Sequence, residues 1–208
     1  MVVRQIFEAV LAFKKDELPS LIRQALDEGV PVEQVLKEGL IAPLDDLGER
    51  FSRGEAFVPE LLMAARAVKA GLEELRPALA EADTPPRGRV VIGTVKGDLH
   101  DIGKNLVAMM LEGAGFRVVN LGVDVRPEAF VEAARESGAD LVCMSALLTT
   151  TMPNMEATIR ALREQGLACR TMVGGAPVTP KFAARVGADG YSHDAPGAVQ
   201  TARRLVGA

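Results

Sequence analysis

The sequence VVIGTVKGDLHDIGKN, residues 90–105, joins an uninterrupted apolar run to a polar segment that contains two glycines and a histidine. Uninterrupted apolar runs are typical of parallel strands, which are covered on both faces. Further runs follow at 117–121, 141–145, 171–173 and, more weakly, 190–191, and helical stretches lie between them at about 103–114, 127–137, 153–166, 180–186 and 196–206. The sequence therefore predicts an α/β domain with a doubly wound, five-stranded parallel sheet, Rossmann-like or flavodoxin-like.

The first 82 residues follow a different period. Their apolar side chains recur at spacings of three and four, and Gly29 and Pro31 mark the point where one helix ends and the next begins. This pattern predicts four amphipathic helices packed as a small bundle. Residues 83–89, DTPPRGR, are polar and contain a proline pair, which favours an extended linker. We therefore expect a helical bundle over 1–82, a linker over 83–89 and an α/β domain over 90–208.

Composition excludes several classes of protein. The 208 residues carry a formal net charge of −4, and the basic residues are scattered along the chain. Aromatic residues make up only 4% of the sequence. Both observations argue against a nucleic-acid partner. No apolar run approaches the ~18 residues of a membrane span, and the N-terminus does not resemble a signal peptide. The two cysteines, Cys143 and Cys169, lie in apolar runs without a C-x-x-C pair. We expect a cytoplasmic protein with no membrane or nucleic-acid partner.

Ligands of doubly wound sheets bind at the carboxyl ends of the strands, so segments 96–105, 145–153 and 174–177 should gather at one edge. Nucleotide motifs fail there. The glycine spacing is one residue too long for a P-loop, Asn105 rather than a hydroxyl residue follows the lysine, and no G-x-G-x-x-G fingerprint is present. A phospho-receiver domain would have an aspartate after its third strand, where this chain has Ser145.

The first segment contains the pattern Asp98-x-His100-x-x-Gly103. A neutral imidazole is a strong ligand for transition metals, and Asp98 could accept a hydrogen bond from its other nitrogen and fix the tautomer. One histidine is too few for a metal cage built by the protein, so a metal here would arrive already chelated by a macrocycle. Gly103 would let the backbone turn tightly or let a bulky ligand approach. The alternative is a surface histidine that is hydrogen-bonded to a neighbouring acid.

The other two segments offer groups that suit a large polar ligand. Residues 145–151 carry four hydroxyl side chains that could bind its polar edges, and Gly174 and Gly175 leave room for a long substituent against the backbone. Small polar residues after parallel strands also form turns or cap helices, so these two segments alone do not decide between the two interpretations.

Three motifs together resemble the signature of the cobalamin-binding domain, which is D-x-H-x-x-G, S-x-L and G-G. They are GDLHDIG at 97–103, SALLT at 145–149 and GG at 174–175. That family includes methionine synthase, methylmalonyl-CoA mutase and the corrinoid proteins of anaerobic methyltransferase systems. The stretch GERFSRGEAFVPELL at 48–62 is similar to the helical cap of methionine synthase and of stand-alone corrinoid proteins. The resemblance covers nearly the whole chain and implies a corrinoid cofactor, cobalamin or a related cobamide, with its cobalt.

The resemblance implies a role for each matching residue. His100 would replace the cofactor's own base and bind cobalt from below, Asp98 would hydrogen-bond the imidazole, and Thr151 would continue the relay where methionine synthase has serine. Three residues of the helical cap would cover the upper face of the corrin, namely Phe57, Leu61 and Val68. The other implied cofactor contacts are Gly97, Leu99, Asp101, Ile102 and Gly103 around the histidine, and Ser145, Leu147, Thr149, Gly174, Gly175 and Ala195 along the channel for the nucleotide tail.

A two-domain chain of this size most resembles the proteins that carry a methyl group on cobalt between a donor and an acceptor methyltransferase, in methanol, methylamine or O-demethylase systems. It would be a component of such a system rather than a complete enzyme, and the linker 83–89 would let the cap move aside for both partners. The alternatives are a cobalamin-dependent regulator or sensor, the cobalamin-binding subunit of a mutase, and an α/β interaction module without a cofactor. A regulator would usually add a DNA-binding domain, and a mutase subunit lacks the helical cap.

Overall fold

The computed structural model describes residues 1–82 and 85–207 of the chain. The chain divides into two compact units, one made of Met1–Pro85 and Glu112–Gly115, and the other of Pro86–Leu111 and Phe116–Ala208. Residues 83 and 84 of the predicted linker lie outside the described residues. Its last residue, Arg89, is the first residue of a strand, because its N–H donates to the Asp140 carboxylate over 2.8 Å and its backbone pairs with the neighbouring strand. The sheet thus begins one residue earlier than the sequence predicts.

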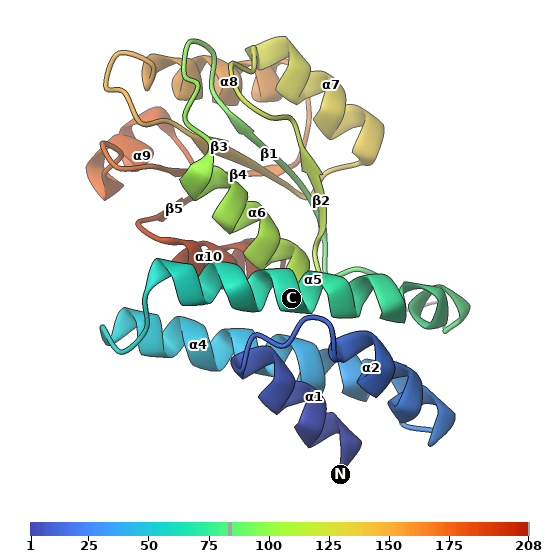
Figure 1. The fold of residues 1–208 in the computed structure, drawn as a ribbon. Helices are drawn as coiled ribbons and strands as arrows, with labels where there is room; N and C mark the ends of the chain where they lie inside the picture. The colour runs from blue at the N-terminus through green and yellow to red at the C-terminus, as the bar shows by residue number, and fades with distance from the viewer. Residues whose placement is uncertain (83–84, 208) are drawn as a thin grey trace. The chain divides into compact units, whose positions relative to one another are not determined.

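The first unit is helical (Figure 1). Its elements are α1 (Val2–Leu11), α2 (Leu18–Asp27), α3 (Val32–Gln34), the π-helix η1 (Val35–Ile41), α4 (Ala42–Ser52) and α5 (Val58–Glu81). Because α3, η1 and α4 follow one another without a break, they form one continuous segment, and the predicted four helices are confirmed. Ile22 and Leu40 are fully buried where α2 and η1 approach Gly71 of α5, at which a β-carbon would lie only 2.8 Å from Leu40. Within the described part of the chain, no helix is both long and apolar enough to cross a bilayer.

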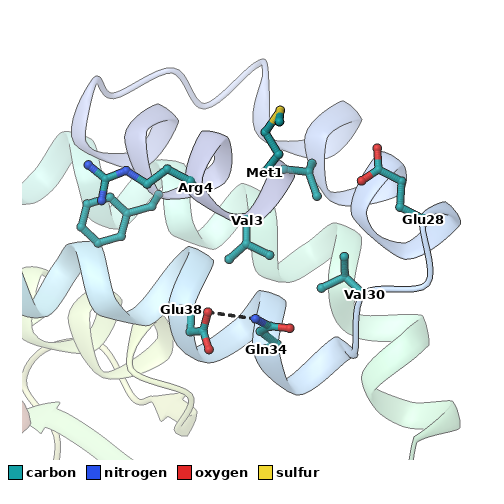
Figure 2. Close-up of a pocket in the computed structure, with 9 residues that line it drawn as sticks. Met1, Val3, Arg4, Glu28, Val30, Gln34 and Glu38 are labelled. Carbon is teal, nitrogen blue, oxygen red and sulfur yellow. Dashed lines mark hydrogen bonds between the residues drawn. The ribbon is translucent and has the colours of Figure 1, made fainter.

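A pocket of about 500 Å³ lies in the helical unit, between the start of α1, the end of α2 and the segment that leads into η1 (Figure 2). Its charged lining residues are Arg4, Glu28 and Glu38, and Gln34 donates to the Glu38 carboxylate over 3.0 Å. The residues that line this pocket include none of the predicted site residues.

The second unit contains a five-stranded sheet whose neighbouring strands are all parallel. Its strands are β1 (Arg89–Thr94), β2 (Arg117–Asn120), β3 (Leu141–Ser145), β4 (Arg170–Gly174) and β5 (Gly190–Ser192), and they alternate with α6 (Ile102–Gly113), α7 (Pro127–Ser137), α8 (Pro153–Glu164), α9 (Pro180–Val186) and α10 (Ala195–Val206). The strand order β2-β1-β3-β4-β5 is the flavodoxin-like order. The predicted doubly wound α/β fold is therefore confirmed.

Helices cover both faces of this sheet, with α7 and α8 on one face and α6 and α10 on the other (Figure 1). Under the first pair, Phe130, Met155 and Ile159 pack in one core cluster with Val91 and Val142 of the central strands. Burial on both faces explains why the strands read as uninterrupted apolar runs. The helix ends follow local chemistry, since α7, α8 and α9 begin with proline and α7, α9 and α10 end at left-handed glycines.

Candidate functional site

The register of the strands aligns their carboxyl ends. Thr94 pairs with Ser145, Ser145 with Gly174, and Gly174 with Ser192. The order of the strands changes direction between β1 and β3, and ligands of doubly wound sheets bind outside this switch point. The segments that follow β1 and β3 meet there, because the N–H of Val95 donates to the carbonyl of Ser145 over 3.0 Å. This is the edge at which the sequence predicts a site.

Asp98 is fully buried at this edge and joins the two segments. Its Oδ1 accepts from the backbone N–H of His100 at 3.1 Å and lies 2.9 Å from Nδ1 of the same residue. Its Oδ2 accepts from the backbone N–H groups of Leu147 at 2.8 Å and Leu148 at 3.1 Å. The Thr151 hydroxyl lies 2.8 Å from both Oδ2 and the Leu148 carbonyl, so its single hydrogen serves one or the other. The structure thus brings together the three residues of the predicted relay.

These contacts determine the charge of Asp98. Burial raises the pKa of Asp98, but the hydrogen bonds from Leu147, His100 and Thr151 outweigh burial and hold this pKa well below its usual range. An ionised carboxylate only accepts hydrogen bonds, so Nδ1 of a neutral His100 carries the proton and Nε2 keeps its lone pair. The His100 side chain is 53% exposed, and Nε2 forms no hydrogen bond with any described residue. The imidazole therefore presents an open metal-ligating nitrogen.

The donor set fits a metal that is already chelated. Among the described residues there is no group of three or more histidine, cysteine, aspartate or glutamate side chains that could hold a metal ion. A metal on His100 would therefore need its other ligands from elsewhere, and the planar nitrogen ligands of a corrin provide them. The open Nε2 of His100 fits the single protein ligand that such a metal would need, and the cobalt site stays a prediction.

Several large apolar side chains on the segments that follow β1, β2 and β3 are exposed. Leu99 and Ile102 flank His100 in the sequence and have 72% and 76% of their surface exposed, and Leu147 and Leu148 after β3 are 42% and 43% exposed. Val123, in the loop after β2, is 36% exposed. Large apolar side chains gathered at one edge of a sheet mark a surface that a ligand or partner covers.

The other residues predicted in the first segment are Gly97, Asp101 and Gly103. Gly97 has a φ of +82°, a left-handed conformation that strains other residues. Asp101 is exposed and accepts from the Asn105 amide over 2.9 Å. Gly103 has no atom within 4 Å of the position of a β-carbon, so the described chain leaves open space beside it. That space is consistent with the expected approach of a bulky ligand, which stays a prediction.

The residues predicted along the tail channel are only partly brought together. Ser145 and Gly174 are register partners at the edge, while Thr149 is exposed and Ala195 is buried at the start of α10. At Gly175 the φ is +124°, and a β-carbon would lie 2.0 Å from the Ala146 carbonyl oxygen. This close approach of two backbones explains the second glycine of the pair. The role of these residues toward a nucleotide tail stays a prediction.

Gly175→Ala is expected to lower the free energy of unfolding by at least about 3 kcal/mol. The added methyl group would collide with the backbone at Ala146, and alanine would be strained at this φ. Gly166→Ala is the matched control, since Gly166 has a φ of +67° but open space around a β-carbon, and its cost should be about 1 kcal/mol. Chemical denaturation of the three proteins measures both values. Equal losses for the two variants would contradict the collision.

The three residues predicted to cover the corrin belong to the helical unit and differ in exposure. Phe57, just before α5, is 68% exposed, whereas Leu61 and Val68 on α5 are fully buried. Of the three, Phe57 is the side chain that is free to meet a ligand in this structure. The covering role of all three stays a prediction.

Several residues that hold the site were not predicted. The Thr94 hydroxyl donates to the His100 carbonyl over 2.9 Å, and the Asn154 amide donates to the Lys96 carbonyl over 2.9 Å. Asp124, in the loop after β2, holds the same segment from its other side. The signal in the sequence is that Asp124 follows the apolar run at 117–121, at a strand end like those of the first, third and fourth strands.

Known proteins show the same two-part organisation. A family model described as a B12 binding domain matches residues 88–200, and a second model with this description matches residues 2–76. Dimethylamine corrinoid protein 1 of Methanosarcina acetivorans is 41% identical over 207 residues, which cover 98% of this chain and 97% of that protein. Trimethylamine corrinoid protein 1 of the same organism is 38% identical, and the match covers 99% of this chain and 97% of that protein.

Solved structures of corrinoid-related proteins also match this chain. A cobalamin-binding protein from Desulfitobacterium hafniense DCB-2 matches with a TM-score of 0.81 and 30% identity over 98% of both chains. A chain of the methanol:cobalamin methyltransferase complex MtaBC from Methanosarcina barkeri matches with a TM-score of 0.88 and 26% identity over 99% of this chain and 80% of that one. The edge-located histidine, the flavodoxin-like sheet and these matches lead to one conclusion: the chain belongs to the B12-binding family of corrinoid proteins.

Proposed function

We propose that this protein is the corrinoid component of a methyltransferase system, and that it carries a methyl group on cobalt from a donor to an acceptor methyltransferase. The observation that carries the proposal is the half-exposed imidazole of His100, which is fixed through Nδ1 on the buried Asp98 and has Nε2 open. The family models and the corrinoid relatives support the cofactor.

When bound, the corrinoid would supply the cobalt on which the methyl group is carried. The chain's own residues orient the ligand and tune its electronics. His100 would hold the cobalt through Nε2, and the ionised Asp98, which lies 2.9 Å from Nδ1, would stabilise the positive charge that the imidazole gains when it binds the metal. Leu99 and Ile102 present apolar surface that would keep water from beneath the ring.

We infer that the donor methyltransferase acts on a methylamine. Relatives named dimethylamine and trimethylamine corrinoid proteins are 41% and 38% identical, whereas the methanol system's chain is 26% identical. We also place the protein in the cytoplasm, which is supported by two free cysteines, Cys143 and Cys169, as is usual in a reducing compartment.

Purified protein mixed with hydroxocobalamin and then desalted is expected to keep its visible absorbance in a stoichiometric amount. After reduction to Co(I), a dimethylamine or trimethylamine donor methyltransferase should methylate the bound cobalt, which the spectral change from Co(I) to methyl–Co(III) measures. Loss of all colour on desalting would refute the proposed carrier. Methylation by a methanol methyltransferase but by neither amine enzyme would refute the donor class alone.

A further inference from the structure

The loop between β2 and α7 reaches the segment that contains Asp98. The Asp124 carboxylate accepts from the Gly97 N–H over 2.7 Å, and the Asp124 N–H donates to the Asp98 carbonyl over 3.0 Å. One residue further, the Val125 N–H donates to the Thr94 carbonyl over 2.9 Å. Asp124 therefore holds the backbone on both sides of the Gly97–Asp98 peptide, and Asp98 is two residues before His100.

Asp124 has an unusual backbone conformation for this task. Its φ is +54°, and Phe13 is the only other non-glycine residue with a positive φ among the described residues. Glycine would adopt this conformation without strain, but it has no carboxylate to accept from Gly97. The strained backbone and the short hydrogen bond from Gly97 together indicate that the carboxylate at this position has a role that glycine could not fill.

The start of the same loop is held by a buried lysine. Lys104, on the first turn of α6, is only 3% exposed, and its ammonium donates to the Asn120 side-chain oxygen over 2.8 Å and to the Asn105 side-chain oxygen. The Asn120 oxygen also accepts from the Gly122 N–H over 3.0 Å. The loop is thus tied to α6 at one end and to the Gly97–Asp98 peptide at the other.

We propose that Asp124 is a positioning residue for the cobalt ligand His100. By fixing the Gly97–Asp98 peptide, it sets where the Asp98 carboxylate lies and therefore how the imidazole is oriented. The inference rests on the proposed ligand role of His100. It requires that the hydrogen bond from the Gly97 N–H to the Asp124 carboxylate orients the imidazole, and that the backbone conformation of residue 124 alone does not.

Three variants of the full chain, produced with ¹⁵N-labelled histidines, loaded with cobalamin and reduced to Co(II), separate these causes. Asp124→Asn keeps an oxygen acceptor and tolerates a positive φ, so nitrogen splitting in the electron paramagnetic resonance spectrum should remain as in the parent. Asp124→Gly and Asp124→Ala both lose the acceptor, and the equilibrium constant for histidine ligation should fall about tenfold in each. A role of the backbone conformation alone predicts that Asp124→Gly matches the parent, and that result would overturn the proposal.

A second comparison excludes a general effect on folding. In a His100→Ala background, Asp124→Ala should change the Kd for cobalamin less than about threefold, because no imidazole is left to position. If Asp124→Ala weakens binding equally with and without His100, its role is structural and the proposal fails. If the parent protein with ¹⁵N-labelled histidines lacks the doublet splitting of ¹⁵N, the ligand role of His100 fails instead, so the two failures are distinguishable.

Discussion

His100→Ala is expected to yield a folded protein that still binds cobalamin but transfers its methyl group at least about 100-fold more slowly, with a changed visible spectrum. The half-exposed imidazole contributes little to the core, so its removal should not unfold the chain. The variant lacks the imidazole that we propose as the cobalt ligand and that Asp98 holds through Nδ1. Stopped-flow transfer from the methyl–Co(III) form to an acceptor methyltransferase measures the rate.

His193→Ala is the matched control for this variant. His193 is the other histidine of the chain, and it is exposed in the loop between β5 and α10. Its removal should leave the spectrum and the transfer rate unchanged. A His100→Ala protein with the parent's spectrum and rate would show that the lower ligand lies elsewhere.

Asp98→Asn is expected to lower the free energy of unfolding by about 2–4 kcal/mol in the absence of any cofactor. Backbone N–H groups point at both carboxylate oxygens, from His100 at Oδ1 and from Leu147 and Leu148 at Oδ2. An amide has one oxygen, so whichever way it is turned its NH₂ group faces a buried donor. Denaturation with urea measures the loss.

The pH dependence of this loss follows from the sign of the pKa shift. Hydrogen bonding outweighs burial and lowers the pKa of Asp98 from its usual value of 3.8, so the ionised carboxylate stabilises the folded state above that pH. The advantage of the parent over Asp98→Asn should therefore be full at neutral pH and shrink as the pH falls below about 4. Asp101→Asn, at an exposed neighbour, should change stability by less than about 0.5 kcal/mol at any pH. A difference between parent and Asp98→Asn that is independent of pH would contradict the assigned ionisation.

Local sequence signals were enough to predict the elements of this fold. Uninterrupted apolar runs placed the strands, and spacings of three and four placed the helices, because burial on two faces or one face leaves these patterns directly in the sequence. The pattern could not show the π-helix η1, since it is a change in hydrogen bonding within one continuous helical segment.

The contacts of the site could be predicted where the two residues are close in the sequence. They could not be predicted where Asp98 is bound by backbone groups from other segments of the chain. Asp98 and His100 are two residues apart, so their contact could be proposed from the sequence alone. The N–H groups of Leu147 and Leu148 and the carboxylate of Asp124 reach this pair only because the strand order puts three loops at one edge. Leu147, predicted as a cofactor contact, thus also holds Asp98 through its backbone.

The proposed function depends on His100 as the protein's ligand to the corrinoid cobalt. The most direct measurement is the electron paramagnetic resonance spectrum of Co(II)-cobalamin bound to protein whose histidines carry ¹⁵N. If His100 ligates cobalt, each nitrogen-split triplet of the unlabelled protein becomes a doublet on labelling, and the splitting is absent in His100→Ala. A triplet that survives labelling would mean that the cofactor keeps its own base, and it would contradict the account.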